Sequence, residues 1–257
     1  PSMLSCLQTV EPARAPSLMT DALAGGSLRL ICRALGLVLL TTVMGLAHNG
    51  SMALAVPLSV AVDGDLSDWP ASIPWQPISI HGFGIPPTDE ADLTARFAAG
   101  HDPATGALFV AVAVRDESLV VEGTGDGMVP WDARDGCEVY VDFAHDDEGT
   151  ASVQYMLYGD ESLTRLPQGA ILDEWGEVRH AVRRVDGAHY YEWEIRPRLE
   201  QQGEAPGPAP FSIAFDVAIC DRDEDGSFSW VSWGLGGVKA RYASSRGDLA
   251  LSTRNDT

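Results

Sequence analysis

Short apolar runs with a period of two dominate the chain from Val56 onward. They are rich in β-branched and aromatic residues, and clusters of Gly, Asp and Pro separate them, which is typical of strands in an antiparallel sandwich. A sustained helical period is absent from this region. We therefore predict strands over residues 57–63, 107–117, 137–143, 152–159, 190–196, 211–220, 229–234 and 248–252.

Alternation indicates which side of these segments faces the core. In "YYEWEIR", Tyr191, Trp193 and Ile195 point one way, whereas Glu192 and Glu194 point the other. In "FSIAFDVAIC" the apolar odd-numbered positions oppose an acidic one in the same manner. The pattern predicts an all-β fold: a single domain that is an antiparallel β-sandwich of jelly-roll or immunoglobulin-like type.

A secretory signal peptide is expected ahead of this domain. Arg29 and Arg33 precede the apolar run "ALGLVLLTTVMGLA", and Ala-Leu-Ala at 53–55 fits a cleavage site before Val56. The alternative is an uncleaved anchor, but "HNGS" interrupts the run before it reaches the roughly 20 residues that a span needs. We therefore divide the chain into an upstream segment with signal peptide and a sandwich domain, residues 1–55 and 56–257.

Such a protein is secreted, periplasmic or at the cell surface, with no membrane span after cleavage of the signal. Its formal net charge is −20 at pH 7. A field of this sign repels phosphate backbones and anionic lipids, so nucleic acid is a poor candidate partner. Neutral ligands, cations and basic proteins remain.

Two cysteines, Cys137 and Cys220, lie within the predicted domain. Export allows a disulfide between them, but both stand in apolar runs where a free thiol packs as a small core residue. The sequence leaves both states open. It contains no CxxC or Cys/His spacing of the kind that binds zinc or attaches haem covalently.

Seven motifs follow one another in an informative order: "VDGDLSDWP", "GALFVAVAVRDES", "WDARDGCEVYVDF", "VQYMLYG", "HYYEWEIRPRLE", "IAFDVAICDRDEDG" and "SWVSWG". This series, from about Val62 to Leu251, resembles the family 9 carbohydrate-binding modules and their relatives in the wider DOMON-like superfamily. The resemblance implies a jelly-roll-like β-sandwich that binds a poly- or oligosaccharide without cleaving it. It also implies calcium-supported loops and a glycoside hydrolase acting nearby.

A sugar site needs flat apolar surfaces for the pyranose and planar polar groups for its hydroxyls. Trp131 and Trp175 stand among Gly, Pro and acids and are the candidate stacking pair, although Trp175 is also suited to packing. Trp193 and Trp230 stand in strand-like runs and are expected in the core. By position in the family, the resemblance adds the polar partners Arg134, Glu138 and Gln154.

A calcium site is expected in "DRDEDGSF", which opens like an EF-hand loop. Ser232 stands where the bidentate Glu would be and no helices flank the loop, so it is not an EF-hand. Backbone oxygens and acids from elsewhere would complete the site, and the alternative is a solvated acidic turn. The candidate ligands are Asp221, Asp223, Asp225, Asp63 and Asp65.

The stretch "VDGDLSDWP" itself is better interpreted as a turn than as a closed metal loop. It lacks the further oxygen ligands that calcium needs. In this interpretation Asp63 and Asp68 form Asx-turns, and Trp69 caps the edge of the sandwich.

Three other functions compete with sugar binding. A glycosidase needs two carboxyl groups about 5 to 9.5 Å apart, and neither such a pair nor a local catalytic signature stands out, so we expect no catalysis. Haem binding of the DOMON type would use Met156 with His180 or His189, against an alternative in which Met156 fills core. A cell-surface module that binds a basic protein partner is the third.

Overall fold

The computed structural model describes residues 49–121, 131–143, 145, 152–159, 162–166, 176–197, 212–239 and 242–252. All of them belong to one compact unit, Leu46–Thr257. Within these ranges, we find no helix with the length and apolar character to cross a membrane.

Strands make up most of the described chain, and helix is limited to single 3-10 turns such as Leu66–Asp68 and Ala243–Ser245. The strands are β1 (Met52–Pro57), β2 (Gln76–Ile78), β3 (Ile80–Gly84), β4 (Leu93–His101), β5 (Leu108–Asp116), β6 (Gly136–Asp142), β7 (Ser152–Tyr158), β8 (Ser162–Leu166), β9 (Gly176–Val185), β10 (Ala188–Pro197), β11 (Ser212–Arg222), β12 (Phe228–Ser232) and β13 (Gly247–Leu251).

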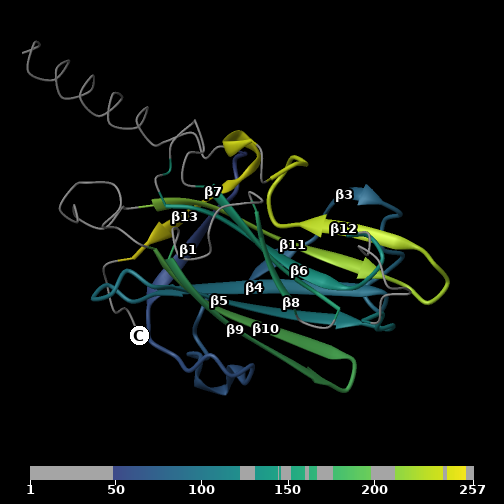
Figure 1. Cartoon of the computed structure of the whole chain (residues 1–257), viewed down its shortest axis with the longest axis horizontal. Helices are drawn as coiled ribbons and strands as arrows, with labels where there is room; N and C mark the ends of the chain where they lie inside the picture. The colour runs from purple at the N-terminus through teal and green to yellow at the C-terminus, as the bar shows by residue number, and fades with distance from the viewer. Residues whose placement is uncertain are drawn as a thin grey trace, which may run out of the picture. The chain divides into compact units, whose positions relative to one another are not determined.

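The strands form two facing layers, as predicted for a sandwich (Figure 1). One layer has the order β8-β7-β6-β11, and the other has the order β4-β5-β10-β9. The long strand β11 pairs with β13 through its first residues and with β12 through its last. Strand β1 connects the layers and lies parallel to both β13 and β4, so the sheet is mixed rather than purely antiparallel.

The main core lies between the layers. The ring of Trp233 lies 5.2 Å from that of Phe97 and 6.1 Å from that of Phe215. Trp193 is fully buried, with its ring 6.4 Å from that of Tyr155. Tyr191, Trp193 and Ile195 all belong to this core, so the alternation predicted for that strand is confirmed.

The predicted strand over 57–63 is wrong, because only Pro57 lies in a strand. In its place Leu58, Val60 and Val62 pack on the outer face of β4 and β5. A side chain satisfies one backbone donor of this segment, since the amide of Ala61 donates to Asp68 Oδ2 at 2.8 Å. The segment is therefore a packed loop that covers a sheet.

Strand β1 begins at Met52, ahead of the predicted boundary at residue 56. Ala53 and Ala55 are buried in β1, where they pair with Leu249 and Leu251 of β13. Ahead of the strand, the Asn49 side-chain amide donates to the carbonyl oxygens of Leu235 and Ser245 at 3.1 and 3.0 Å. Cleavage before Val56 would remove most of a strand that connects the two layers.

Both cysteines are free and buried. In the β6–β11 ladder, Cys137 pairs with Ile219, and Cys220 pairs with Gly136. Cys137 therefore faces the main core, whereas Cys220 lies on the outer face of the same layer. The sheet separates the two thiols, which decides between the states that the sequence left open.

Candidate functional site

The opening loop, residues 62–70, is organised by one carboxylate of β10. Glu192 accepts the backbone amides of Asp63 and Gly64, each at 2.9 Å, and the indole N–H of Trp69 at 2.8 Å. Asp63 Oδ1 accepts the amide of Asp65 in an Asx-turn, and Trp69 is buried. The Asx-turn predicted at Asp63 is thus present, whereas Asp68 accepts the amide of Ala61, seven residues earlier, in place of the predicted Asx-turn.

Asp65 is occupied elsewhere in this loop. It accepts the Ser67 amide at 3.1 Å and forms an ion pair with Arg183 at 2.8 Å. These bonds lower the pKa of Asp65, the contact with Ser67 having the largest effect. The structure does not group Asp63 or Asp65 with Asp221, so it does not assemble the five-residue calcium set expected from the sequence.

Three buried carboxylates converge at one end of the sandwich instead. Asp116 ends β5, Asp135 directly precedes β6, and Asp221 lies near the end of β11. Each has a carboxylate oxygen within 4.8 Å of the others. We call these three residues the buried acidic cluster.

Hydrogen bonds position the buried acidic cluster, but they do not reach all of its carboxylate oxygens. Asp135 accepts the amides of Val120 and Arg222, both at 2.7 Å, and Asp116 accepts that of Ser118 at 2.7 Å. Both Asp221 oxygens are buried, and neither has a hydrogen-bond donor in the described part of the chain. Buried polar atoms are rarely left this way, and these oxygens can accept a proton or a cation.

Charge repulsion in the cluster is strong. Burial, followed by the charge of Asp135, raises the pKa of Asp116 to about 7. Burial also raises the pKa of Asp135 to about 7 and that of Asp221 to about 8, with repulsion from Asp116 next in effect on Asp221. Three such groups near pH 7 favour either retained protons or a bound cation.

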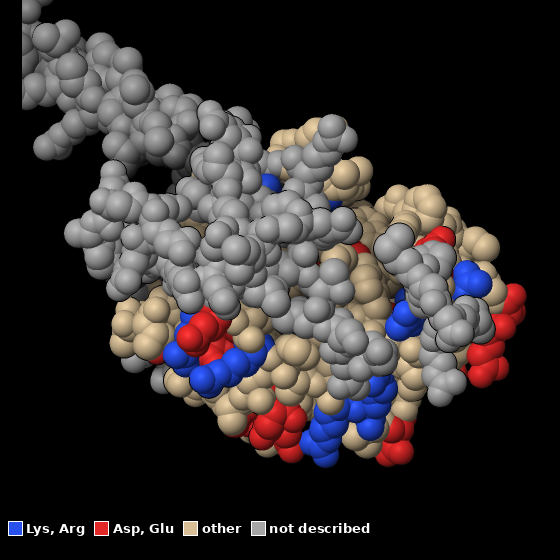
Figure 2. Space-filling model, in the orientation of Figure 1, with Lys and Arg blue, Asp and Glu red and all other residues tan. Residues whose placement is uncertain are grey.

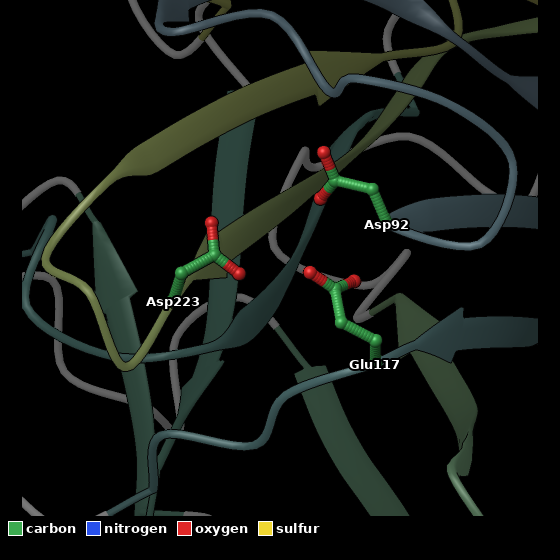
Figure 3. Close-up of side chains that lie close together, drawn as sticks. All are labelled: Asp92, Glu117 and Asp223. Atoms are coloured by element: carbon green, nitrogen blue, oxygen red, sulfur yellow. The ribbon is translucent and has the colours of Figure 1, made fainter.

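A second, more exposed group of acids lies beside the first. Asp92, Glu117 and Asp223 also offer oxygens within 4.8 Å of one another, and Figure 3 shows their carboxylates turned toward a common space. Asp225 is exposed, and it shares the hydroxyl of Ser227 with Asp223 at 2.6 Å. Of the predicted calcium ligands, the structure therefore brings Asp221, Asp223 and Asp225 to one region.

A polar centre occupies the outer face of β6, β7 and β12. Glu138 accepts hydrogen bonds from the hydroxyls of Tyr140 and Tyr158 and from the indole N–H of Trp230, the last at 3.0 Å. Gln154 donates to the Tyr140 hydroxyl at 3.1 Å. Burial, with repulsion from Glu138, raises the pKa of Tyr140, so its hydroxyl remains a donor.

Aromatic rings extend this face to the solvent. Trp131 lies just before β6 and has 44% of its surface exposed, and Phe83 of β3 has 53% exposed. Their ring centroids are 5.4 Å apart, and Phe228 packs against Trp131 at 5.0 Å. Because Phe228 and Trp230 belong to one cluster with Tyr140, the exposed rings adjoin the polar centre.

The model of the "Carbohydrate family 9 binding domain-like" family matches residues 62–245. The chain belongs to this family. A search of curated proteins found no match.

Solved structures agree with the family at the level of the fold. A family 9 carbohydrate-binding module from Caldicellulosiruptor kristjanssonii in complex with cellotriose has a TM-score of 0.62 at 15% identity, with 80% of this chain and 96% of that chain covered. The same values hold for its glucose complex, except that 98% of that chain is covered. A putative carbohydrate-binding protein from Bacteroides uniformis has a TM-score of 0.50 at 13% identity, covering 79% and 99%.

This family 9 chain brings most of its predicted sugar residues to one face. Trp131, Glu138 and Gln154 lie on the face just described. Arg134 lies against Gly159 at the end of β7, so that a methyl group on Gly159 would meet Arg134 Cδ at 2.5 Å. Trp175 lies outside the described residues.

Sequence reasoning missed several residues of this face. Trp230 is buried, as expected, but in a smaller cluster on the outer side of its layer, where it donates to Glu138. The alternation of Phe228 and Trp230 was a usable signal, since both fall on the same side of β12. The other missed residues are Phe83, Tyr140 and Tyr158.

The haem alternative is not assembled in this family 9 sandwich. Met156 pairs with Glu138 and therefore lies on the outer side of β7. His180 and His189 lie on the core side of the other layer, His180 with its ring 6.1 Å from that of Trp193. A sheet therefore stands between the methionine and both imidazoles.

Proposed function

We propose that this domain binds saccharides, without cleaving them, on the outer face of β6, β7 and β12. The proposal rests on the contact between an exposed aromatic surface and a buried polar centre. Exposed Trp131 and Phe83 adjoin a buried polar centre in which Glu138 holds Tyr140, Tyr158 and Trp230.

The chemistry of this face suits a pyranose ring. An indole face packs against the apolar C–H side of a sugar, and orientated hydroxyl, amide and carboxylate groups bond its hydroxyls. Here Glu138 accepts hydrogen bonds from the hydroxyls of Tyr140 and Tyr158, and Gln154 donates to the Tyr140 hydroxyl. A pre-organised face of this kind loses little entropy on binding.

Glucose and short β-glucans are the sugars to test first. Two of the similar structures are complexes with cellotriose and glucose. At 15% identity they support the choice of probe, and the residues of this chain have to establish specificity. Secretion and action beside a glycoside hydrolase belong to the same proposal.

We further propose that calcium stabilises the loops at the buried acidic cluster. The residues fit a hard cation, because Asp116, Asp135 and Asp221 offer carboxylate oxygens and those of Asp221 lack donors. The ion would neutralise repulsion between buried charges. Asp92, Glu117 and Asp223 form an adjacent oxygen-rich set for a second cation.

Isothermal titration calorimetry of the purified protein with glucose, cellobiose and cellotriose tests the sugar proposal. We expect saturable binding whose affinity falls at least tenfold in Trp131→Ala and in Phe83→Ala. This corresponds to a loss of about 1.4 kcal/mol in binding free energy. Tyr242→Ala, which removes an equally exposed ring on the Ala243–Ser245 side, is the matched control. Unchanged affinity in both site variants, or no heat from folded protein with any of the sugars, would refute the proposal.

A further inference from the structure

A second hollow lies on the opposite layer, away from the face proposed for neutral sugars. It has a volume of about 740 Å³ and opens on the outer side of β4, β5, β9 and β10. The opening loop borders it through Gly64, Asp65 and Leu66. A volume in this range accommodates a small ligand.

Strand register explains the shape of the hollow. Arg96, Ala113, Tyr190 and Arg183 lie directly across from one another on four neighbouring strands. In the next row, Arg115 lies between Thr94 and Ala188, again with all three side chains on the outer side. Two alanines therefore form a shallow floor, and long arginine side chains stand around it.

The charge of the hollow contrasts with that of the protein. Arg96 and Arg115 are exposed, and neither forms an ion pair with a residue that the structure describes. Arg96 lies over the Trp75 ring at 4.6 Å, and Arg183 pairs with Asp65 at 2.8 Å. Asp186 is the other acid of the lining. Three arginines and two acids thus line a hollow in a chain whose formal net charge is −20.

The arginines of the hollow differ in their ion pairs from the other arginines of this layer. Figure 2 shows basic and acidic side chains side by side along the lower edge of the view, where Figure 1 draws β9 and β10. Elsewhere on this layer arginines do have partners: Arg179 lies 3.5 Å from Glu194, and Arg196 donates to the same carboxylate. Arg96 and Arg115 differ from these arginines, because neither forms an ion pair within the described part of the chain.

We propose that this hollow is a second binding site, for a short acidic saccharide that carries uronic acid carboxylates. The planar guanidinium groups of Arg96 and Arg115 match the planar carboxylate in bidentate geometry. Tyr190, half-buried between the alanines, offers its ring to the apolar side of a sugar. A second carboxylate of the ligand competes with Asp65 for Arg183. The site therefore favours ligands with more than one negative group.

The test uses the whole protein in buffer with 150 mM salt and fixed calcium. Calorimetry compares trigalacturonate with its fully methyl-esterified form, which keeps the sugar rings and removes the charge. The site variant is Arg96→Gln with Arg115→Gln. Arg179→Gln is the charge control, because it removes an exposed arginine from the same face outside the hollow, and Trp131→Ala is the control for the other site.

We expect saturable binding of trigalacturonate that falls at least tenfold in the double variant. It should persist in Arg179→Gln and Trp131→Ala and be absent with the methyl ester. Three results would overturn the proposal: no binding by the unaltered protein, equal loss in Arg179→Gln, or equal displacement by inorganic phosphate at the same concentration. Since Trp131→Ala separates the sites, failure here leaves the neutral-sugar proposal untouched.

Discussion

Glu192 and Trp69 are joined by a hydrogen bond of 2.8 Å between a carboxylate and an indole nitrogen, although 123 residues separate them in the chain. The same carboxylate holds the amides of Asp63 and Gly64. One side chain of β10 therefore fixes the loop that covers the outer face of β4 and β5. This loop also forms one wall of the second hollow.

Replacing Glu192, whose side chain is fully buried, should destabilise the domain. Glu192→Ala leaves three donors without their acceptor, two of them buried, and we expect a loss of about 3 kcal/mol in the free energy of unfolding. Urea unfolding followed by tryptophan fluorescence measures it. Glu224→Gln, on an exposed turn, is the control, and a change below about 1 kcal/mol in Glu192→Ala would contradict this role.

Gly64 is required for two physical reasons that can be separated. Its φ of +80° favours glycine, and a Cβ there would lie 2.9 Å from Arg183 Cβ. Gly50 has a similar φ of +86° but open space around it, so Gly50→Ala reports backbone strain alone. We expect Gly64→Ala to lower the unfolding free energy by about 1 kcal/mol more than Gly50→Ala does. Equal losses in chemical denaturation would assign the whole effect to strain.

The N-terminal strand should be needed for stability. A protein that begins at residue 56 lacks Asn49 and four of the six residues of β1, and so loses buried Ala53 and Ala55. We expect it to unfold at least about 10 °C below a protein that begins at residue 46, which corresponds to several kcal/mol for a domain of this size. Differential scanning calorimetry of the two proteins decides this. Matching transition temperatures would restore the boundary at 56.

Calcium should raise stability most at neutral to alkaline pH. The pKa values near 7 for Asp116 and Asp135 and near 8 for Asp221 exceed that of an unfolded aspartate, 3.8. The folded, metal-free protein therefore holds more protons than the unfolded chain, so its stability falls as pH rises from about 4 to 8. Calcium at 100 times its dissociation constant would add about 2.7 kcal/mol.

Thermal unfolding in EDTA and in calcium, at pH 5 and pH 8, measures this effect. The calcium shift should be about 5–10 °C at pH 8 and much smaller at pH 5. Asp221→Asn should abolish the shift and stabilise the EDTA form at pH 8, whereas Glu224→Gln should do neither. His189 has the opposite pH dependence. Burial lowers its pKa from 6.5 to about 4, so its contribution to folding stability is lost as pH falls through that interval. A calcium shift independent of pH would exclude the buried acidic cluster as its source.

Most strands were predictable because their side chains alternate between two environments. Strands β1, β2, β3, β4, β8 and β9 were not predicted, and the error at β4 is related to the wrong strand over 57–63. Strand β4 contains "ARFAAG", mostly small residues with weak β propensity, and from Phe97 onward it is buried on both faces because the opening loop covers its outer side there. The predicted strand over 57–63 is apolar for the complementary reason, since it is the loop that covers β4.

The candidate sites show the same division. Local sequence pointed to Trp131 and the acids of "DRDEDG", because each stands among residues of a recognisable type, and the family resemblance added Glu138. It did not identify Asp116 and Asp135 as companions of Asp221, from which they are distant in the chain. It grouped Asp63 and Asp65 with Asp221, whereas Glu192 and Arg183 hold the loop that carries them.

The sequence by itself determined the all-β class and the inward side of "YYEWEIR", since a period of two is a local property of the chain, and the order of its motifs indicated the family. Only the tertiary structure decided that Cys137 and Cys220 face opposite ways, that Trp230 supports an outer face, and that three distant aspartates meet. The physical reason is that alternation assigns a side chain to one face of its strand, whereas strand register and the packing of the layers determine which residues of other strands share that face.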